Sequence, residues 1–88
     1  MFILSKDKRK LINLNNVASI CIKNEYSQHS HPSTWWEIRA MYPAVSNDVL
    51  CDTLWVYDTE ELCRDAFNKL CCRIVSGKEN EIIDMNDL

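Results

Sequence analysis

Hydrophobic and polar residues alternate along the first part of the chain at the spacing of short β-strands. Residues 2–4 and 11–14 are largely apolar and flank the charged segment 5–10, which predicts two strands joined by a turn. Residues 17–22 are rich in β-branched side chains and predict a third extended segment. Residues 23–34 are polar and show no apolar period, so they are predicted to be a connection.

Two longer alternating segments, 35–42 and 49–57, predict a β-hairpin. An antiparallel register then pairs two tryptophans on the inner face and two opposite charges on the outer face. These pairs are Trp36 with Trp55, and Arg39 with Asp52. Opposite charges that face each other across the strands favour this register.

The most regular pattern in the chain is an apolar stripe at helical spacing over residues 59–76. Its members are Leu62, Cys63, Ala66, Phe67, Leu70, Cys71, Ile74 and Val75. Asp58 is the predicted N-cap, Glu61 completes a capping box, and Gly77 is the predicted stop. Together the segments predict a single α+β domain over residues 1–88. Its antiparallel sheet of about four strands is covered on one face by this C-terminal amphipathic helix.

Residues 79–88 form an acidic tail that also contains apolar side chains. The apolar members are Ile82, Ile83, Met85 and Leu88. Both a short docked segment and a frayed end fit a tail of this composition.

The composition narrows the functional classes. The 88 residues are 47% hydrophobic and 26% charged, as in folded domains, and the formal net charge is -3. This charge does not suit a protein that binds many nucleic-acid phosphates, so we expect a protein partner and no direct contact with nucleic acid. The single glycine excludes glycine-rich phosphate loops. A signal peptide and an apolar membrane-spanning run are both missing, which predicts a cytoplasmic protein with no membrane partner.

The outer face of the predicted hairpin mixes apolar and charged side chains that a helix on the other face leaves uncovered. It comprises Trp35, Glu37, Arg39, Met41, Leu50, Asp52, Leu54 and Val56. Trp, Met and Arg are common anchors of protein interfaces. We therefore expect a partner-binding face, contacted by another protein or by a second copy in a homodimer. The structural alternative is that the tail folds over this face.

Five cysteines and two histidines provide ligand types that zinc prefers. An odd number of cysteines cannot all pair within the chain, and a reducing compartment keeps them as thiols or thiolate ligands. Two candidate zinc sites are Cys51, Cys71 and Cys72, or Cys21, His29 and His31. The alternative is that the cysteines are small core residues and the histidines lie in a solvated loop.

Three stretches carry a resemblance: FILSKDKRKLINLNNVASICI, WWEIRAMY and LWVYDTEELCRDAFNKL. Their order resembles a group of small, mostly unassigned proteins carried by Gram-positive bacteria and their phages. The resemblance implies an antiparallel sheet of short strands followed by one amphipathic helix that begins at Thr59-Glu60-Glu61. In size, charge and origin the chain is also similar to anti-CRISPR proteins, which block Cas nucleases by binding them. The cysteines, the histidine-containing loop and Trp35-Trp36 depart from that group and indicate an added metal or binding specialisation.

Two functional hypotheses follow from these patterns. The first is a phage or mobile-element inhibitor that binds a host protein stoichiometrically, with Cas9 and its loading with nucleic acid as the candidate target. The second is a zinc-stabilised homodimeric module with a structural or regulatory role. Catalysis is not expected, because both histidines lie in one predicted loop and a sheet with one helix offers no evident cleft for a nucleophile and its base.

Overall fold

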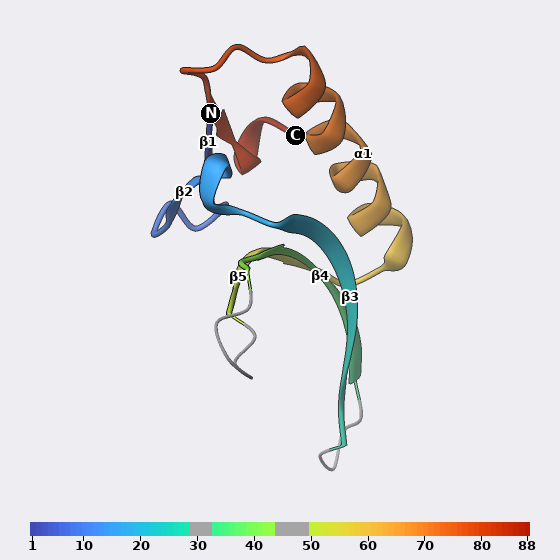
Figure 1. Cartoon of the computed structure of the whole chain (residues 1–88). Helices are drawn as coiled ribbons and strands as arrows, with labels where there is room; N and C mark the ends of the chain where they lie inside the picture. Colours follow the sequence, from blue (N-terminus) through green and yellow to red (C-terminus); the bar gives the residue numbers. More distant parts are fainter. Residues whose placement is uncertain (29–32, 44–49) are drawn as a thin grey trace.

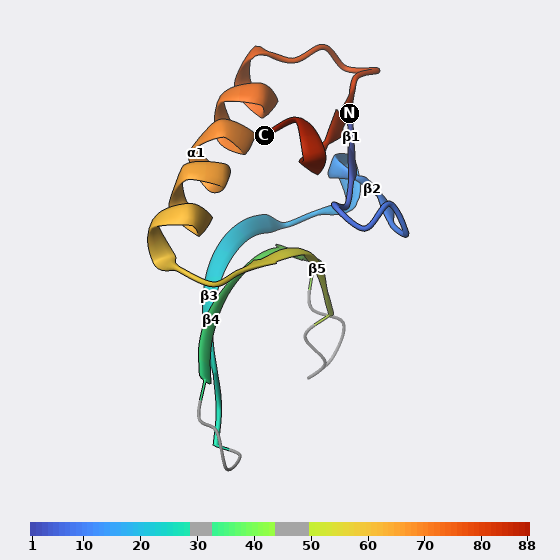
Figure 2. The same cartoon turned by 180° about the vertical axis from the view of Figure 1, so that it is seen from behind.

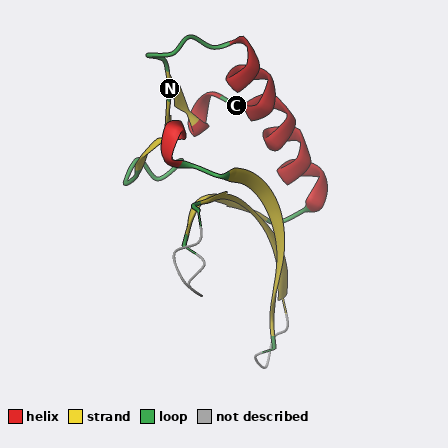
Figure 3. Ribbon diagram, viewed as in Figure 1, coloured by secondary structure: helices red, strands yellow, loops and turns green. Residues whose placement is uncertain are grey.

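Two small β-sheets and one α-helix make up the described part of the chain (Figure 1). The structure is a computed structural model that describes residues 1–28, 33–43 and 50–88. Its elements are β1 (Phe2–Leu4), β2 (Leu11–Asn13), the 3-10 turn η1 (Leu14–Asn16), β3 (Ser19–Ser27), β4 (Ser33–Met41), β5 (Cys51–Tyr57), α1 (Glu60–Ser76), β6 (Ile82–Asp84) and the 3-10 turn η2 (Met85–Asp87). Figure 3 separates these elements by colour. The α+β class with one amphipathic helix is confirmed, but two three-stranded sheets replace the single sheet of about four strands.

The small sheet joins the two ends of the described chain. Its order is β2-β1-β6, with β2 antiparallel and β6 parallel to β1. Ile3 on the central strand pairs with Ile12 and Ile83, and all three are at most 3% exposed. The Phe2 amide also donates a hydrogen bond to the Glu81 carbonyl at 2.9 Å. The tail is therefore docked as a strand and is not frayed.

The large sheet is built around a hairpin of two nine-residue strands, β3 and β4. Its order is β3-β4-β5, and both strand pairs are antiparallel. The pairing of β3 with β4 runs from Ser19 with Met41 to Ser27 with Ser33, so residues 23–27 are strand and not the predicted connection. This end of the hairpin extends beyond α1 (Figure 1). Because α1 does not cover this end, its strands need no apolar side chains on one face. They therefore lack the apolar alternation by which a half-buried strand is recognised in a sequence.

A β-bulge in β5 changes the predicted hairpin register. Ile38 pairs with Trp55, but the next residue, Arg39, pairs with Thr53, which leaves Leu54 as the extra residue. The predicted pairs, Trp36 with Trp55 and Arg39 with Asp52, are wrong, because Trp36 pairs with Tyr57 and Arg39 with Thr53. A shift of one residue moves a side chain to the other face of a sheet, so this difference changes the composition of both faces.

The two ends of α1 differ from the predicted ones. Thr59, not Asp58, is the N-cap, and its hydroxyl oxygen accepts a hydrogen bond from the Leu62 amide at 3.2 Å. Gly77 follows the helix with a φ of -78°, which any residue can adopt. Glycine is required there by space, because a Cβ atom would lie 2.7 Å from the Arg73 carbonyl oxygen.

One hydrophobic core connects both sheets to α1. It contains Ile3, Ile12, Ile38, Ala40, Leu54, Cys63, Ala66, Leu70, Ile83 and Met85. Leu62 and Val75, predicted as part of the helical stripe, are 57% and 87% exposed and flank the buried helix positions. Seen from behind, α1 lies along the convex side of the curved β3–β4 pair (Figure 2). Within the described ranges, no helix has both the length and the apolar character needed to cross a membrane.

Candidate protein-binding face

The predicted binding residues centre on the side of the large sheet that turns away from α1. Trp36, Ile38 and Ala40 of β4 pack on the core, so the residues between them and their strand partners turn to the opposite side. We call this side the outer face. In the described chain it comprises Ser19, Cys21, Lys23, Glu25, Ser27, Ser33, Trp35, Glu37, Arg39, Met41, Cys51, Thr53 and Val56. The sheet curves so that the outer face is its concave side (Figure 1; Figure 2).

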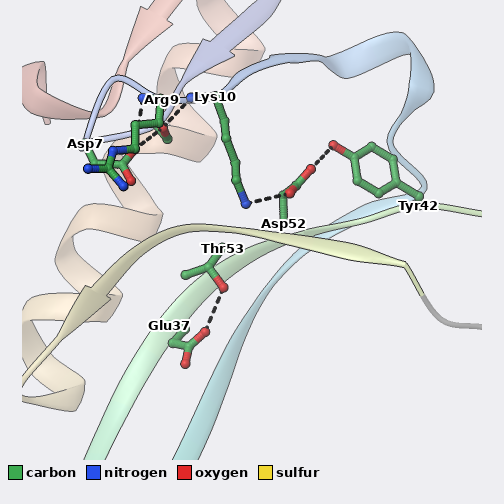
Figure 4. Close-up of polar contacts among 8 residues, drawn as sticks. Asp7, Arg9, Lys10, Glu37, Tyr42, Asp52 and Thr53 are labelled. Atoms are coloured by element: carbon green, nitrogen blue, oxygen red, sulfur yellow. Dashed lines mark hydrogen bonds and ion pairs between the residues drawn. The ribbon is translucent and has the colours of Figure 1, made fainter.

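Glu37 lies at the centre of this face and holds three other side chains in place. Its Oε2 atom accepts a hydrogen bond from the Trp35 indole N–H at 2.7 Å. Its Oε1 atom accepts from Arg39 Nε at 3.0 Å. The same atom accepts from the Thr53 hydroxyl at 2.9 Å (Figure 4). Arg39 Nη2 also donates to Glu25 Oε1 at 2.8 Å. The outer face therefore presents a tryptophan and an arginine that both donate to the Glu37 carboxylate, and the arginine donates to Glu25 as well.

The electrostatics of this cluster favour its charged state. Burial alone would raise the pKa of Glu37, but hydrogen bonds from Arg39, Trp35 and Thr53 outweigh it and hold the pKa below its usual value. The same hydrogen bond to Glu37 raises the pKa of Arg39. Glu37 is only 9% exposed, so its charge is directed mainly at these donors and little at solvent. At neutral pH both Glu37 and Arg39 are therefore charged.

Five of the eight predicted binding residues lie on the outer face: Trp35, Glu37, Arg39, Met41 and Val56. Leu50 precedes β5 and is 55% exposed. Leu54 is 1% exposed within the core, so its predicted place on the binding face is wrong.

Asp52 is also misplaced by the predicted register, because it pairs with Ala40 and shares the inner face. Before the bulge, the observed pairing differs from the predicted one by one residue, and Asp52 changes sides. After the bulge the difference grows to two residues. Val56 pairs with Glu37 instead of the predicted Trp35, and an even shift leaves the Val56 side chain on the predicted face.

Asp52 instead connects the large sheet to the β1–β2 turn (Figure 4). Its Oδ1 atom lies 2.8 Å from Lys10 Nζ, and its Oδ2 atom accepts from the Tyr42 hydroxyl at 2.7 Å. The hydrogen bonds from Lys10 and Tyr42 lower the pKa of Asp52, whereas burial raises the pKa of Tyr42 to about 12. In the same turn, Lys6 Nζ lies 5.6 Å from the centre of the Trp55 ring. The inner side of β5 is thus covered by the chain's own N-terminal turn.

Two members of the outer-face cluster were not found by sequence reasoning. Thr53 was assigned to the inner face by the predicted register, and Glu25 fell in the predicted connection. A usable signal was present in β3, where Cys21, Lys23 and Glu25 continue the two-residue alternation of the predicted extended segment 17–22. A polar strand that continues a hairpin beyond its helix keeps this period without apolar residues.

One candidate zinc site is not assembled in the described chain. Cys51 is exposed at the start of β5, whereas half-buried Cys71 and exposed Cys72 lie on α1. Among the described residues, no group of three or more His, Cys, Asp or Glu side chains could hold a metal ion. Zinc binding by these three thiols stays a prediction. Cys63 is a core residue, and burial raises the pKa of its thiol.

The second candidate zinc site is placed only in part. Cys21 lies on the outer face at the β3 edge of the large sheet and is half-buried. His29 and His31 lie outside the described residues. This zinc site therefore stays a prediction, and so does the homodimer that it would stabilise.

Comparisons with protein-family models, with curated proteins and with solved structures found no match to this chain.

Proposed function

We propose that this protein is a small inhibitor that binds a host protein stoichiometrically through the outer face. The observation that carries this proposal is the set of hydrogen bonds that Glu37 accepts from Trp35, Arg39 and Thr53. A sheet does not require a buried carboxylate on the side that turns away from its helix, because polar side chains there can usually be left to water. The network is better explained by the need to hold two interface side chains in one geometry.

Preorganisation of this kind favours binding. Tryptophan and arginine supply a large share of the binding energy in protein interfaces, and a side chain that is fixed before binding loses less entropy when the partner arrives. Trp35 and Arg39 are both partly buried and both bonded to Glu37. The concave shape of the outer face, visible in Figure 2, suits a convex partner surface.

The charges of the outer face are balanced, which bears on the class of partner. Its two positive side chains, Lys23 and Arg39, are balanced by two negative ones, Glu25 and Glu37. Apolar area comes from Met41 at the end of β4 and from Val56, which is 41% exposed. A balanced face with apolar anchors is typical of a protein interface and does not imitate the dense negative charge of DNA. The proposed target is therefore a protein surface, and Cas9 is the candidate that the sequence resemblance suggests.

The inhibitor acts in this proposal by occupying a surface that the target needs for loading with nucleic acid. The test is a titration of the protein into a guide-directed DNA cleavage reaction of purified Cas9, together with capture of the purified nuclease on immobilised protein. Inhibition should reach its plateau near one inhibitor per nuclease and be relieved by excess target. Complete inhibition far below the equimolar ratio would contradict occupancy, and a lack of both binding and inhibition would remove this target.

Variants of the outer face make the assignment of the surface testable. Trp35→Ala and Arg39→Ala should each weaken binding of the target by about tenfold or more, since interface anchors of these types commonly contribute that much. Val75→Ala is the matched control, because Val75 is 87% exposed on α1 at the opposite side of the sheet. Equal binding by all three variants would show that the outer face is not the binding surface.

A further inference from the structure

β3 is one of the two longest strands of the described chain and lies at a sheet edge. It has nine residues and lies at one end of the order β3-β4-β5. Figure 1 shows β3 in front of β4, at the near edge of the sheet. Edge strands present unpaired N–H and C=O groups that can pair with another strand, and proteins commonly shorten or cover them for this reason.

The hydrogen bonds at the end of the hairpin show which backbone groups of β3 are unpaired. Tyr42 donates its amide to the Leu50 carbonyl at 2.9 Å and so faces β5, whereas the Met41 carbonyl faces β3 and accepts from the Ala18 amide at 2.8 Å. Backbone direction alternates along an antiparallel strand. The β3 residues that face β4 are therefore Ser19, Cys21, Lys23, Glu25 and Ser27, and those that face the free edge are Ile20, Ile22, Asn24 and Tyr26.

The two edges of the large sheet differ in whether other parts of the chain bond to them. At the β5 edge, the Lys6 amide donates to the Leu54 carbonyl at 3.3 Å, and Lys10 pairs with Asp52. At the β3 edge, no backbone hydrogen bond outside the sheet ladders involves residues 19–27 among the described parts of the chain. One edge is thus closed by the β1–β2 turn, and none of the residues that the structure describes closes the other.

We propose that a second copy of this chain pairs with the open edge of β3, antiparallel and about a two-fold axis at Asn24. The sheet would then continue from one copy into the other without a break. In this arrangement Asn24 pairs with Asn24 of the second copy, and Ile22 pairs with Tyr26 of the second copy. Both pairs use the backbone groups that point away from β4, so no hydrogen bond of the large sheet has to break.

The charges of β3 select this register. Centred on Asn24, the pairing places Lys23 opposite Glu25 of the second copy, and the symmetry repeats the ion pair. These residues then form the more closely spaced kind of antiparallel pair, in which side chains lie nearer to each other. A register centred on Lys23 or on Glu25 would oppose like charges, and one centred on Ile22 would leave Lys23 opposite Cys21. Opposite charges stabilise and like charges destabilise directly opposed positions.

A hollow beside β3 supports the same register. It has a volume of about 480 Å³ and lies between β3 and α1, where Ile20, Ile22, Trp36 and Phe67 line it. Tyr26 is 56% exposed and lies on the same side of the sheet as Ile22. In the Asn24-centred pairing, Tyr26 of the second copy lies opposite Ile22 and its ring covers the apolar wall of this hollow. The contact is reciprocal, as a two-fold interface requires.

Proline at Asn24 tests the pairing with little risk to the fold. Asn24→Pro removes an N–H that points to the free edge, and proline is accepted in edge strands at such positions. Asn24→Ala is the matched control, because it keeps the N–H. In sedimentation equilibrium with reductant present, the wild type and Asn24→Ala should be dimers at the same concentrations at which folded Asn24→Pro is a monomer. A wild type that stays monomeric up to millimolar concentration, or an Asn24→Pro variant that dimerises like the wild type, would overturn the proposal.

A charge exchange provides the second test and does not depend on the proline variant folding. Lys23→Glu and Glu25→Lys should each weaken self-association by about tenfold or more, because both convert two attractive pairs into repulsive ones. When the two variants are mixed, every opposed pair is complementary again, so a mixed dimer should form. Failure of the mixture to associate better than either variant alone would contradict the Asn24-centred register.

Discussion

Lys10 and Asp52 form an ion pair between the two sheets, with 2.8 Å between Lys10 Nζ and Asp52 Oδ1. They are 42 positions apart in the sequence. Lys10 belongs to the turn of the small sheet and Asp52 to β5 of the large one, and Asp52 also accepts the Tyr42 hydroxyl. This carboxylate therefore fixes the position of one sheet relative to the other.

The two contacts of Asp52 should differ in strength. Lys10 is 47% exposed, so a double-mutant cycle of Lys10→Ala with Asp52→Asn should give a coupling of only about 0.5 kcal/mol. The cycle of Tyr42→Phe with Asp52→Asn should give about 1 kcal/mol or more, because a charged acceptor strengthens the hydrogen bond of the hydroxyl. Urea denaturation of the single and double variants measures both values. A larger coupling for Lys10 than for Tyr42 would contradict this order.

Docking of the tail should contribute strongly to stability. Ile83 is fully buried between β1 and the core, so Ile83→Ala should lower the free energy of unfolding by about 2 to 5 kcal/mol. Ile82 is the next residue in the same strand and is 54% exposed, so Ile82→Ala should cost much less. Thermal or urea denaturation of the two variants provides the comparison. Similar losses for both would mean that β6 is not docked in the register described.

The buried carboxylate of Glu37 should make stability fall at low pH. Because its pKa in the folded state lies below the ordinary value of 4.5, its contribution is complete above pH 4.5 and is lost as pH falls through the lower folded-state value. Glu37→Gln should cost about 2 kcal/mol at pH 7 and progressively less at pH 4 and below. Urea denaturation at several pH values measures this gap. Glu79→Gln, an exposed change in the tail, is the control and should show no comparable gap.

The zinc hypothesis at Cys21, His29 and His31 makes a prediction about metal content. If Cys21, His29 and His31 supply ligands, native mass spectrometry of protein purified without chelator should show about one zinc per chain. Chelation should then lower the melting temperature, because metal binding is coupled to folding. The variant Cys21→Ser should lose the metal, and Cys72→Ser should retain it. A metal-free spectrum, with melting unchanged by chelator, would remove the zinc site.

The helix and most strands could be predicted because their signals are local. The stripe over residues 59–76 contains the buried positions Cys63, Ala66 and Leu70, and a helix of that length needs such a stripe to dock. Three members of the outer-face cluster, Trp35, Glu37 and Arg39, could be predicted for the same reason, because they alternate within one strand. Alternation within a strand assigns residues to a face without any knowledge of the neighbouring strand.

The bulge and the second sheet could not be predicted because their signals are not local. Leu54 and Trp55 are consecutive apolar residues, and nothing in their sequence shows which of them leaves the regular pairing. The partner of β6 is β1, at the other end of the described chain. The three residues Ile82–Asp84 are too few to show a strand pattern by themselves, so only this distant pairing defines the strand. The division into two sheets depends on this distant pairing.

The parallel pairing of β1 with β6 has a consequence for the order in which the protein folds during its synthesis. β1 leaves the ribosome well before its partner, Ile82–Asp84, which is synthesised about eighty residues later, after several seconds at ordinary rates of translation. Throughout that interval the hydrophobic side of β1 has no β6 to pair with, whereas the β3–β4 hairpin already has both of its strands. The hairpin is thus free to form first, and the small sheet can be completed only after β6 has been synthesised.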